Sequence, residues 1–136
     1  IAHHVTQQLD LDLSLPAVGQ GVIGIESRAD DARSRAALAP LHHADSFTRL
    51  VAERSFAATL GGSCHSPIAA HASLDGGRLT VRGFIGAPDG SETYRDQVDG
   101  SVTEAAALGH ELARRMQAAG AGQLLERLRQ EAAATP

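Results

Sequence analysis

The residue whose type and setting best suit chemistry is Cys64, the single cysteine in 136 residues. It stands in the glycine-rich stretch 61–67 (GGSCHSP), between a segment that predicts a helix and one that predicts a strand. An exposed loop of this kind offers backbone N–H groups and a neighbouring imidazole, and both favour the thiolate form of a cysteine. A reachable thiolate would be a nucleophile or a covalent attachment point, and the residues alone do not decide between the two.

Two other interpretations of Cys64 stay open on this pattern. A lone cysteine is often a small buried side chain without reactivity, which would make the chain an α+β interaction or regulatory module with an inert cysteine. Cys64, His65 and His71 also form a loose set of potential metal ligands. That set lacks a fourth ligand and a recognised spacing, so we expect no metal site.

Composition excludes several classes of protein. One cysteine rules out a disulfide framework and fits a reducing compartment, so we expect a cytoplasmic location. No apolar run approaches the roughly 20 residues that span a bilayer. The net charge of −4 argues against a dedicated nucleic-acid binder, and all 12 basic side chains are arginine, which excludes lysine Schiff-base chemistry. We therefore expect no membrane or nucleic-acid partner, and we also expect a monomer. A start at Ile1 leads us to expect a longer parent protein.

Helical spacing and caps predict the elements that precede the cysteine. A short helix is expected over 32–39, capped by Asp30 or Asp31, and a longer one over 45–60, capped by Asp45 or Ser46. Glycines 61 and 62 end the longer helix, because glycine accepts the left-handed conformation found there. The spacing predicts one face of this helix that carries Phe47, Leu50, Val51, Arg54 and Ala58, with Phe56 and Leu60 on another.

After the cysteine the period changes to two, which predicts strands over 68–74, 78–86 and 91–98 joined by short turns. A capping box at 101–104 begins a helix that Gly120 ends, and a second helix is expected over 123–133. The predicted fold is α+β, a three-stranded antiparallel sheet with helices on one face. A segment of a neighbouring domain precedes it, with an extended stretch at 10–15 and a strand at 22–27. Between these two, Gln20 lies between glycines in a bend. The bend is either a tight connection into the strand or a turn that places the Gln20 amide in a cleft.

Several short strings occur together in a specific order. They are PAVGQG at 16–21, GIE at 24–26 followed by Arg28 and Asp30-Asp31, AER at 52–54, LGGSC at 60–64, PI at 67–68 and GAPDG at 86–90. In this order and spacing the chain resembles the C-terminal part of the porphobilinogen deaminase (hydroxymethylbilane synthase) family over residues 13 to 125. The common loop of that family reads LEGGC, whereas this chain has LGGSC, which keeps a small flexible loop and the sulfur.

The resemblance implies a transferase of tetrapyrrole (haem) biosynthesis. Such enzymes condense four porphobilinogen molecules into hydroxymethylbilane with loss of ammonia, so porphobilinogen and the growing pyrrole chain are the implied partners. A dipyrromethane cofactor hangs by a thioether from a loop cysteine, and the matching residue is Cys64. A soft, thiolate-capable sulfur suits attack on the methylene that ammonia leaves. By the same resemblance Gln20 contacts cofactor or substrate.

The resemblance also implies a division into domains. Residues 1–15 match the end of a second domain, 16–39 a hinge, strand and helix that return to the first domain, and 40–136 the cofactor-anchoring third domain. The family's catalytic aspartate and substrate-binding arginines belong to the first two domains, so we assign no catalytic residue here. The 136 residues are therefore expected to be inactive alone.

Overall fold

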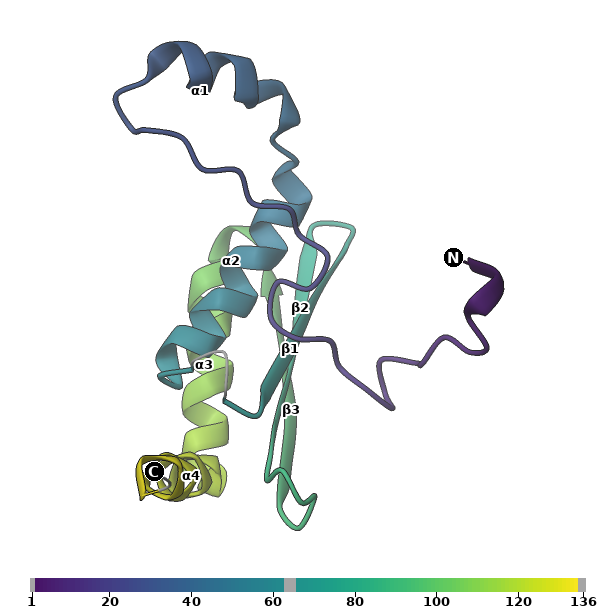
Figure 1. Ribbon diagram of the computed structural model, residues 1–136, viewed down its shortest axis with the longest axis vertical. Helices are drawn as coiled ribbons and strands as arrows, with labels where there is room; N and C mark the ends of the chain where they lie inside the picture. Colours follow the sequence, from purple (N-terminus) through teal and green to yellow (C-terminus); the bar gives the residue numbers. More distant parts are fainter. Residues whose placement is uncertain (1, 63–65, 135–136) are drawn as a thin grey trace.

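The computed structural model describes residues 2–62 and 66–134 (Figure 1). Its centre is an antiparallel sheet in the order β1-β2-β3, formed by Ile68–Asp75, Arg78–Gly86 and Thr93–Ser101. Helix α2 (Ala44–Thr59) packs mainly on β1, and α3 (Ala105–Met116) packs on β2 and β3. In Figure 1 these helices lie on one side of the sheet, and the N-terminal segment starts on the other side and then crosses to α2 and α1. The predicted α+β fold is confirmed.

Helix α2 differs from its prediction in its cap and in its buried face. His43 caps it instead of Asp45 or Ser46, because the His43 Nδ1 accepts the Ser46 N–H at 3.3 Å. The predicted face with Phe47 points largely to solvent, since Phe47 is 55% exposed. The side that packs inward carries Ala52 and Glu53 together with Phe56 and Leu60, which were predicted to lie on another face.

Close approach of α3 explains which face of α2 is buried. A Cβ on Gly109 of α3 would meet the Ala52 carbonyl oxygen, so only glycine permits this distance between the helices. The small side chain of Ala52 therefore turns inward. Because the contact depends on a partner 57 positions away in the numbering, the spacing of large apolar residues within α2 did not reveal it.

The sheet follows the predicted alternation along β2. Leu79, Val81 and Ile85 are fully buried against the helices, as expected. β1 joins β2 through Gly76 and Gly77, which both have positive φ (53° and 83°), as a type I′ hairpin requires.

The third strand begins later than predicted, at 93 instead of 91. The Asp89 Oδ1 accepts both the N–H and the O–H of Ser91, at 3.0 and 2.7 Å. The Ala87 N–H also donates to the Glu92 carbonyl at 2.8 Å, so residues 87–92 form the turn. β3 then runs on to Ser101, which pairs with Arg78.

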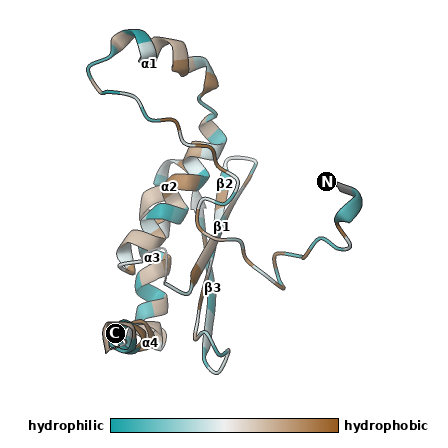
Figure 2. Ribbon diagram, in the orientation of Figure 1, coloured by the Kyte–Doolittle hydropathy of each residue, from teal (hydrophilic) through white to brown (hydrophobic). Residues whose placement is uncertain are grey.

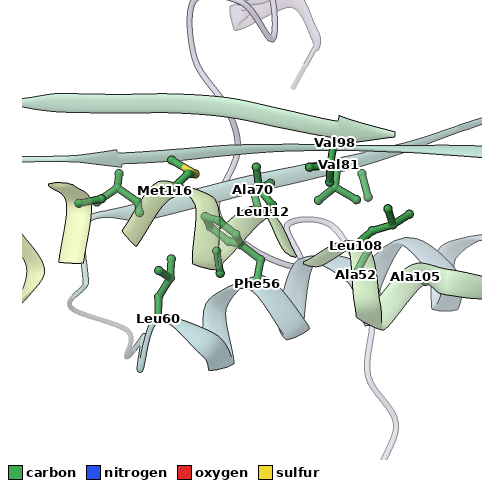
Figure 3. Close-up of a cluster of buried hydrophobic side chains, with 14 of the residues drawn as sticks. Ala52, Phe56, Leu60, Ala70, Val81, Val98, Ala105, Leu108, Leu112 and Met116 are labelled. Carbon is green, nitrogen blue, oxygen red and sulfur yellow. The ribbon is translucent and has the colours of Figure 1, made fainter. Parts of the chain in front are cut away.

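The helices after the sheet complete the core. The stripe of Leu108, Leu112 and Met116 on α3 is buried, as predicted, and Gly120 with φ 119° separates α3 from α4 (Gly122–Ala134). Figure 3 shows these side chains meeting those of α2 and the sheet. The largest fully buried side chains are Phe56, Leu60, Leu79, Ile85, Leu112, Met116, Leu124 and Val81.

The segment before α2 contributes little to this core. Asp31 caps α1 (Ala32–Leu38), as predicted, through a 3.0 Å bond from the Ser34 N–H, but no residue of α1 is buried. The predicted strand at 22–27 is not formed, because none of the described strands lies beside it, and Ile23 is 88% exposed. Figure 2 shows hydrophobic residues in this segment and in α1 away from the sheet.

Candidate functional site

The loop that carries Cys64 leaves α2 through a tightly bonded helix end. The Gly61 N–H donates to the Ala58 carbonyl at 3.1 Å and the Gly62 N–H to the Ala57 carbonyl at 2.9 Å. With φ of 64° at Gly61, these two bonds make a Schellman motif. A Cβ on Gly62 would lie 2.5 Å from the Ile68 Cδ1 and 3.0 Å from the Ala57 carbonyl oxygen, so local space requires glycine there, whereas the positive φ favours glycine at position 61.

An arginine from the far end of the chain fixes the same helix end. Arg129 of α4 donates through Nη2 to the Leu60 carbonyl at 2.6 Å, and its Nη1 lies 3.2 Å from Glu126 Oε2. A guanidinium at a helix C-terminus also interacts favourably with the helix dipole. In Figure 1, α4 is seen nearly end-on, at the same end of the molecule as the C-terminal end of α2.

The other end of the loop is bonded to the sheet. The Ile68 N–H donates to the Ser66 carbonyl at 2.8 Å, and the Gly86 N–H donates to the Pro67 carbonyl at 3.1 Å. Residues 63–65, which include Cys64 and His65, lie outside the described part of the chain. The loop is thus characterised by its two ends, Gly62 and Ser66, and both are held by backbone hydrogen bonds.

A hollow of about 330 Å³ opens beside Ser66 and Pro67 on the sheet face opposite the helices. The Arg95 guanidinium lies 4.7 Å from the centre of the Phe84 ring and donates to the Asp12 carbonyl at 3.3 Å. Among its other lining residues are Leu13, Leu15, Ile68 and Ala87. The loop therefore adjoins an open, partly apolar surface with one cation.

Gln20 lies in two consecutive turns that are packed against this unit. Its N–H donates to the Ala17 carbonyl at 3.0 Å, and the Val22 N–H donates to the Gly19 carbonyl at 3.1 Å. Positive φ values at Gly19 and Gly21 (72° and 80°) allow both turns. The Gln20 side chain is exposed, so the prediction that it reaches a ligand is not tested by its contacts.

Sequence reasoning missed Glu53, which connects the Gln20 turn to the sheet. Its carboxylate accepts the Gly19 N–H and the Ala72 N–H, each at 2.8 Å. In the sequence, Glu53 stands out only as part of the AER string at 52–54. A correct assignment of the buried face of α2 would have revealed it, because a carboxylate inside a buried stripe needs polar partners.

A polar cluster of Glu92, Tyr94 and Arg127 lies at the end of the sheet where β2 passes into β3. The Tyr94 hydroxyl donates to Glu92 Oε1 at 2.6 Å, and Arg127 Nη2 lies 2.6 Å from Glu92 Oε2. The bond from Tyr94, with that from Arg127, lowers the pKa of Glu92, and the same bond raises the pKa of Tyr94. The cluster therefore connects α4, through Arg127, to the turn between β2 and β3.

Within residues 2–62 and 66–134, no three His, Cys, Asp or Glu side chains gather in a way that could hold a metal ion. His71 lies in β1, while Cys64 and His65 are outside those ranges. Over the same residues no helix has the length and apolar character needed to cross a membrane.

The fold and the site together define an α+β domain with a single cysteine in the loop between α2 and β1. The loop leaves α2 through two glycines and enters β1 through Ser66 and Pro67. Residues 47–118 match the family model for the C-terminal domain of porphobilinogen deaminase. The chain belongs to this family.

Relatives over most of the chain bear the same name. Porphobilinogen deaminase of Trichlorobacter lovleyi is 48% identical over 122 residues, which are 90% of this chain and 39% of that protein. The porphobilinogen deaminase of Acidithiobacillus ferrooxidans is 45% identical over 125 residues, 92% of this chain and 40% of that protein. The chain thus spans about two-fifths of the length of these relatives.

Proposed function

We propose that the chain is the cofactor-anchoring part of a porphobilinogen deaminase, a transferase that condenses four porphobilinogen molecules into hydroxymethylbilane with release of ammonia. The proposal rests on the family match at 47–118, which covers most of α2, the Cys64 loop and the sheet. The name of the relatives, porphobilinogen deaminase, supports porphobilinogen as the proposed substrate, in a reaction of porphyrin and haem biosynthesis.

Cys64 is the proposed point of attachment for dipyrromethane through a thioether. The residues present fit such a group: the chain has one thiol, and the hollow beside Ser66 and Pro67 leaves open space next to the loop. When bound, the cofactor primes the growing pyrrole chain. The chain's own contribution is to hold the sulfur between two fixed backbone ends, which limits the positions that the anchored group can reach.

We assign the segments of the chain to separate domains of the enzyme, each with its own role. Residues 1–15 and 16–39 would belong to the second and first domains of the enzyme, and 40–136 to the anchoring domain. Gln20 is the proposed contact to cofactor or substrate. The groups that move protons and bind substrate carboxylates would lie in the remaining three-fifths of the enzyme, so the 136 residues alone should form no bilane.

The test is intact-protein mass spectrometry of the full-length enzyme that contains this chain. The wild-type enzyme should carry an added mass of two porphobilinogen units less two ammonia molecules, and Cys64→Ser should lack it. Ser63→Ala, which changes a hydroxyl in the same loop and leaves the sulfur, is the matched control and should keep the mass. An unchanged covalent mass in Cys64→Ser would contradict the proposal.

A thiol titration separates the anchor from the alternative of an interaction module with an inert cysteine. In the 136-residue chain without cofactor, an anchoring Cys64 should react with a thiol reagent before unfolding. Reaction only after unfolding would favour the alternative.

A further inference from the structure

Glu53 is the one charged residue that is buried among residues 2–62 and 66–134, with 7% of its surface exposed. Both of its carboxylate oxygens are used. Oε2 accepts the N–H of Gly19 and Oε1 accepts the N–H of Ala72, each at 2.8 Å. One side chain on α2 thus joins two backbone segments that are 53 positions apart in the numbering.

These bonds account for a charge in the core. A buried carboxylate is unfavourable unless hydrogen bonds replace its hydration. In the described part of the chain, no arginine or histidine nitrogen is recorded within 4.0 Å of Glu53. In this part of the chain, the two amide N–H groups replace the lost hydration of the carboxylate. Such bonds suit this task because hydrogen bonds to a charged acceptor are stronger than those between neutral groups.

Each of the two donors lies where the backbone would otherwise lack a partner. β1 is an edge strand of the sheet, so amides on its outer side have no neighbouring strand, and Ala72 is one of them. Gly19 belongs to both turns around Gln20, 17–20 and 19–22, and its own N–H donates to neither.

The position of Gly19 against α2 is sterically specific as well. Its φ of 72° favours glycine, and a Cβ there would lie 3.1 Å from Leu50 Cδ1, one turn before Glu53. Next to it, Val18 packs against the hydrophobic core. The turn at 17–22 is therefore seated on α2, and Glu53 supplies its directional bond.

We propose that Glu53 is a positioning residue that holds the turn at 17–22, and with it Gln20, in fixed register against α2 and β1, the strand that follows the Cys64 loop. The functional part of this inference rests on the proposed function, in which Gln20 meets the group anchored at Cys64. The structural part, a carboxylate clasp between residues 19 and 72, can be tested by itself.

The structural test is amide hydrogen exchange by NMR on the 136-residue chain. A hydrogen bond to a charged group contributes a factor of about 10 to 100, so Glu53→Ala should speed exchange at both Gly19 and Ala72 by at least about tenfold. The Gly62 amide, bonded to the Ala57 carbonyl, is the internal control and should change little. Glu111→Gln, an exposed carboxylate on α3, is the matched variant and should leave all three amides unchanged.

Glu53→Gln keeps the shape of the side chain and one acceptor oxygen, so it remains informative if Glu53→Ala does not fold. Its amide oxygen can accept one of the two N–H groups, and the other should lose protection. Unchanged exchange at both Gly19 and Ala72 in Glu53→Gln would overturn the clasp.

The functional test is a double-mutant cycle in the full-length enzyme, with Glu53→Gln, Gln20→Ala and both changes together. If Glu53 acts through Gln20, each single variant should raise KM for porphobilinogen several-fold more than it lowers kcat. The double variant should then be no worse than Gln20→Ala alone. Fully additive effects would overturn the positioning role.

Cofactor mass distinguishes failure of this inference from failure of the proposed function. A wild-type enzyme without the added mass would refute the anchor and leave the exchange result standing. A wild-type enzyme with the mass, combined with an unchanged KM in Glu53→Gln, would refute positioning alone.

Discussion

Replacing Phe56 by alanine removes the largest of the fully buried side chains in the described core. Its ring packs directly on β2, where a Cβ on Gly83 would lie 2.9 Å from the ring carbons, and Figure 3 shows it between the helices and the sheet. The lost burial and the cavity left behind should cost about 3–5 kcal/mol of unfolding free energy. That is a large share of the roughly 5–15 kcal/mol that stabilises an ordinary domain.

Phe47 on the same helix provides the control, because its side chain is 55% exposed and its recorded ring contact is with His42. Phe47→Ala should cost less than about 1 kcal/mol. In urea unfolding followed by circular dichroism, with an m-value of about 2 kcal/mol/M, Phe56→Ala should lower the midpoint by about 1.5–2.5 M. A loss for Phe47→Ala equal to that for Phe56→Ala would refute the assignment of the buried face.

Three further predictions concern the end of α2, the contact between α2 and α3, and the polar cluster at Glu92. Gly61→Ala should destabilise by about 1 kcal/mol in the same assay, because alanine disfavours its φ of 64°, and a neutral effect would contradict the helix-end geometry. Gly109→Ala should cost about 1–3 kcal/mol by separating α3 from Ala52, and retention of full stability would contradict the close helix contact. The bond from Tyr94 lowers the pKa of Glu92, so its contribution to stability is present above the unfolded-state pKa of about 4.3 and is lost as pH falls through the folded value. Melting temperatures from pH 3 to 7 should therefore vary less in Glu92→Gln than in wild type, and parallel curves would contradict this.

The parts of the fold that sequence predicted best are those where backbone geometry demands a residue type. Glycine at positive φ marks the end of α2, the β1–β2 turn and the break at Gly120. The buried face of α2 escaped prediction because it is set by the approach of α3 at Gly109. The strand expected at 22–27 has the right composition, but composition alone forms no strand where the described residues provide no pairing partner.

In the candidate site, too, residues with a recognisable sequence pattern could be predicted and residues defined by distant contacts could not. Cys64 and Gln20 could be singled out because a lone thiol and an amide between glycines are visible in the sequence, and the family match bears out the resemblance on which their roles depend. Their roles stay predictions. Glu53 could be singled out only once the buried face of α2 was assigned correctly, since its partners are the backbone N–H groups of Gly19 and Ala72, which carry no side-chain signature.

Peptide-level mass spectrometry of the full-length enzyme tests the central claim most directly. Trypsin cleaves after Arg54 and Arg78, and the peptide 55–78 between them contains Cys64 and no other arginine or lysine. The account predicts that this peptide carries two porphobilinogen units less two ammonia molecules, with fragment ions that place the addition on Cys64. An unmodified 55–78 peptide from active enzyme, or the same addition on a different peptide, would contradict it.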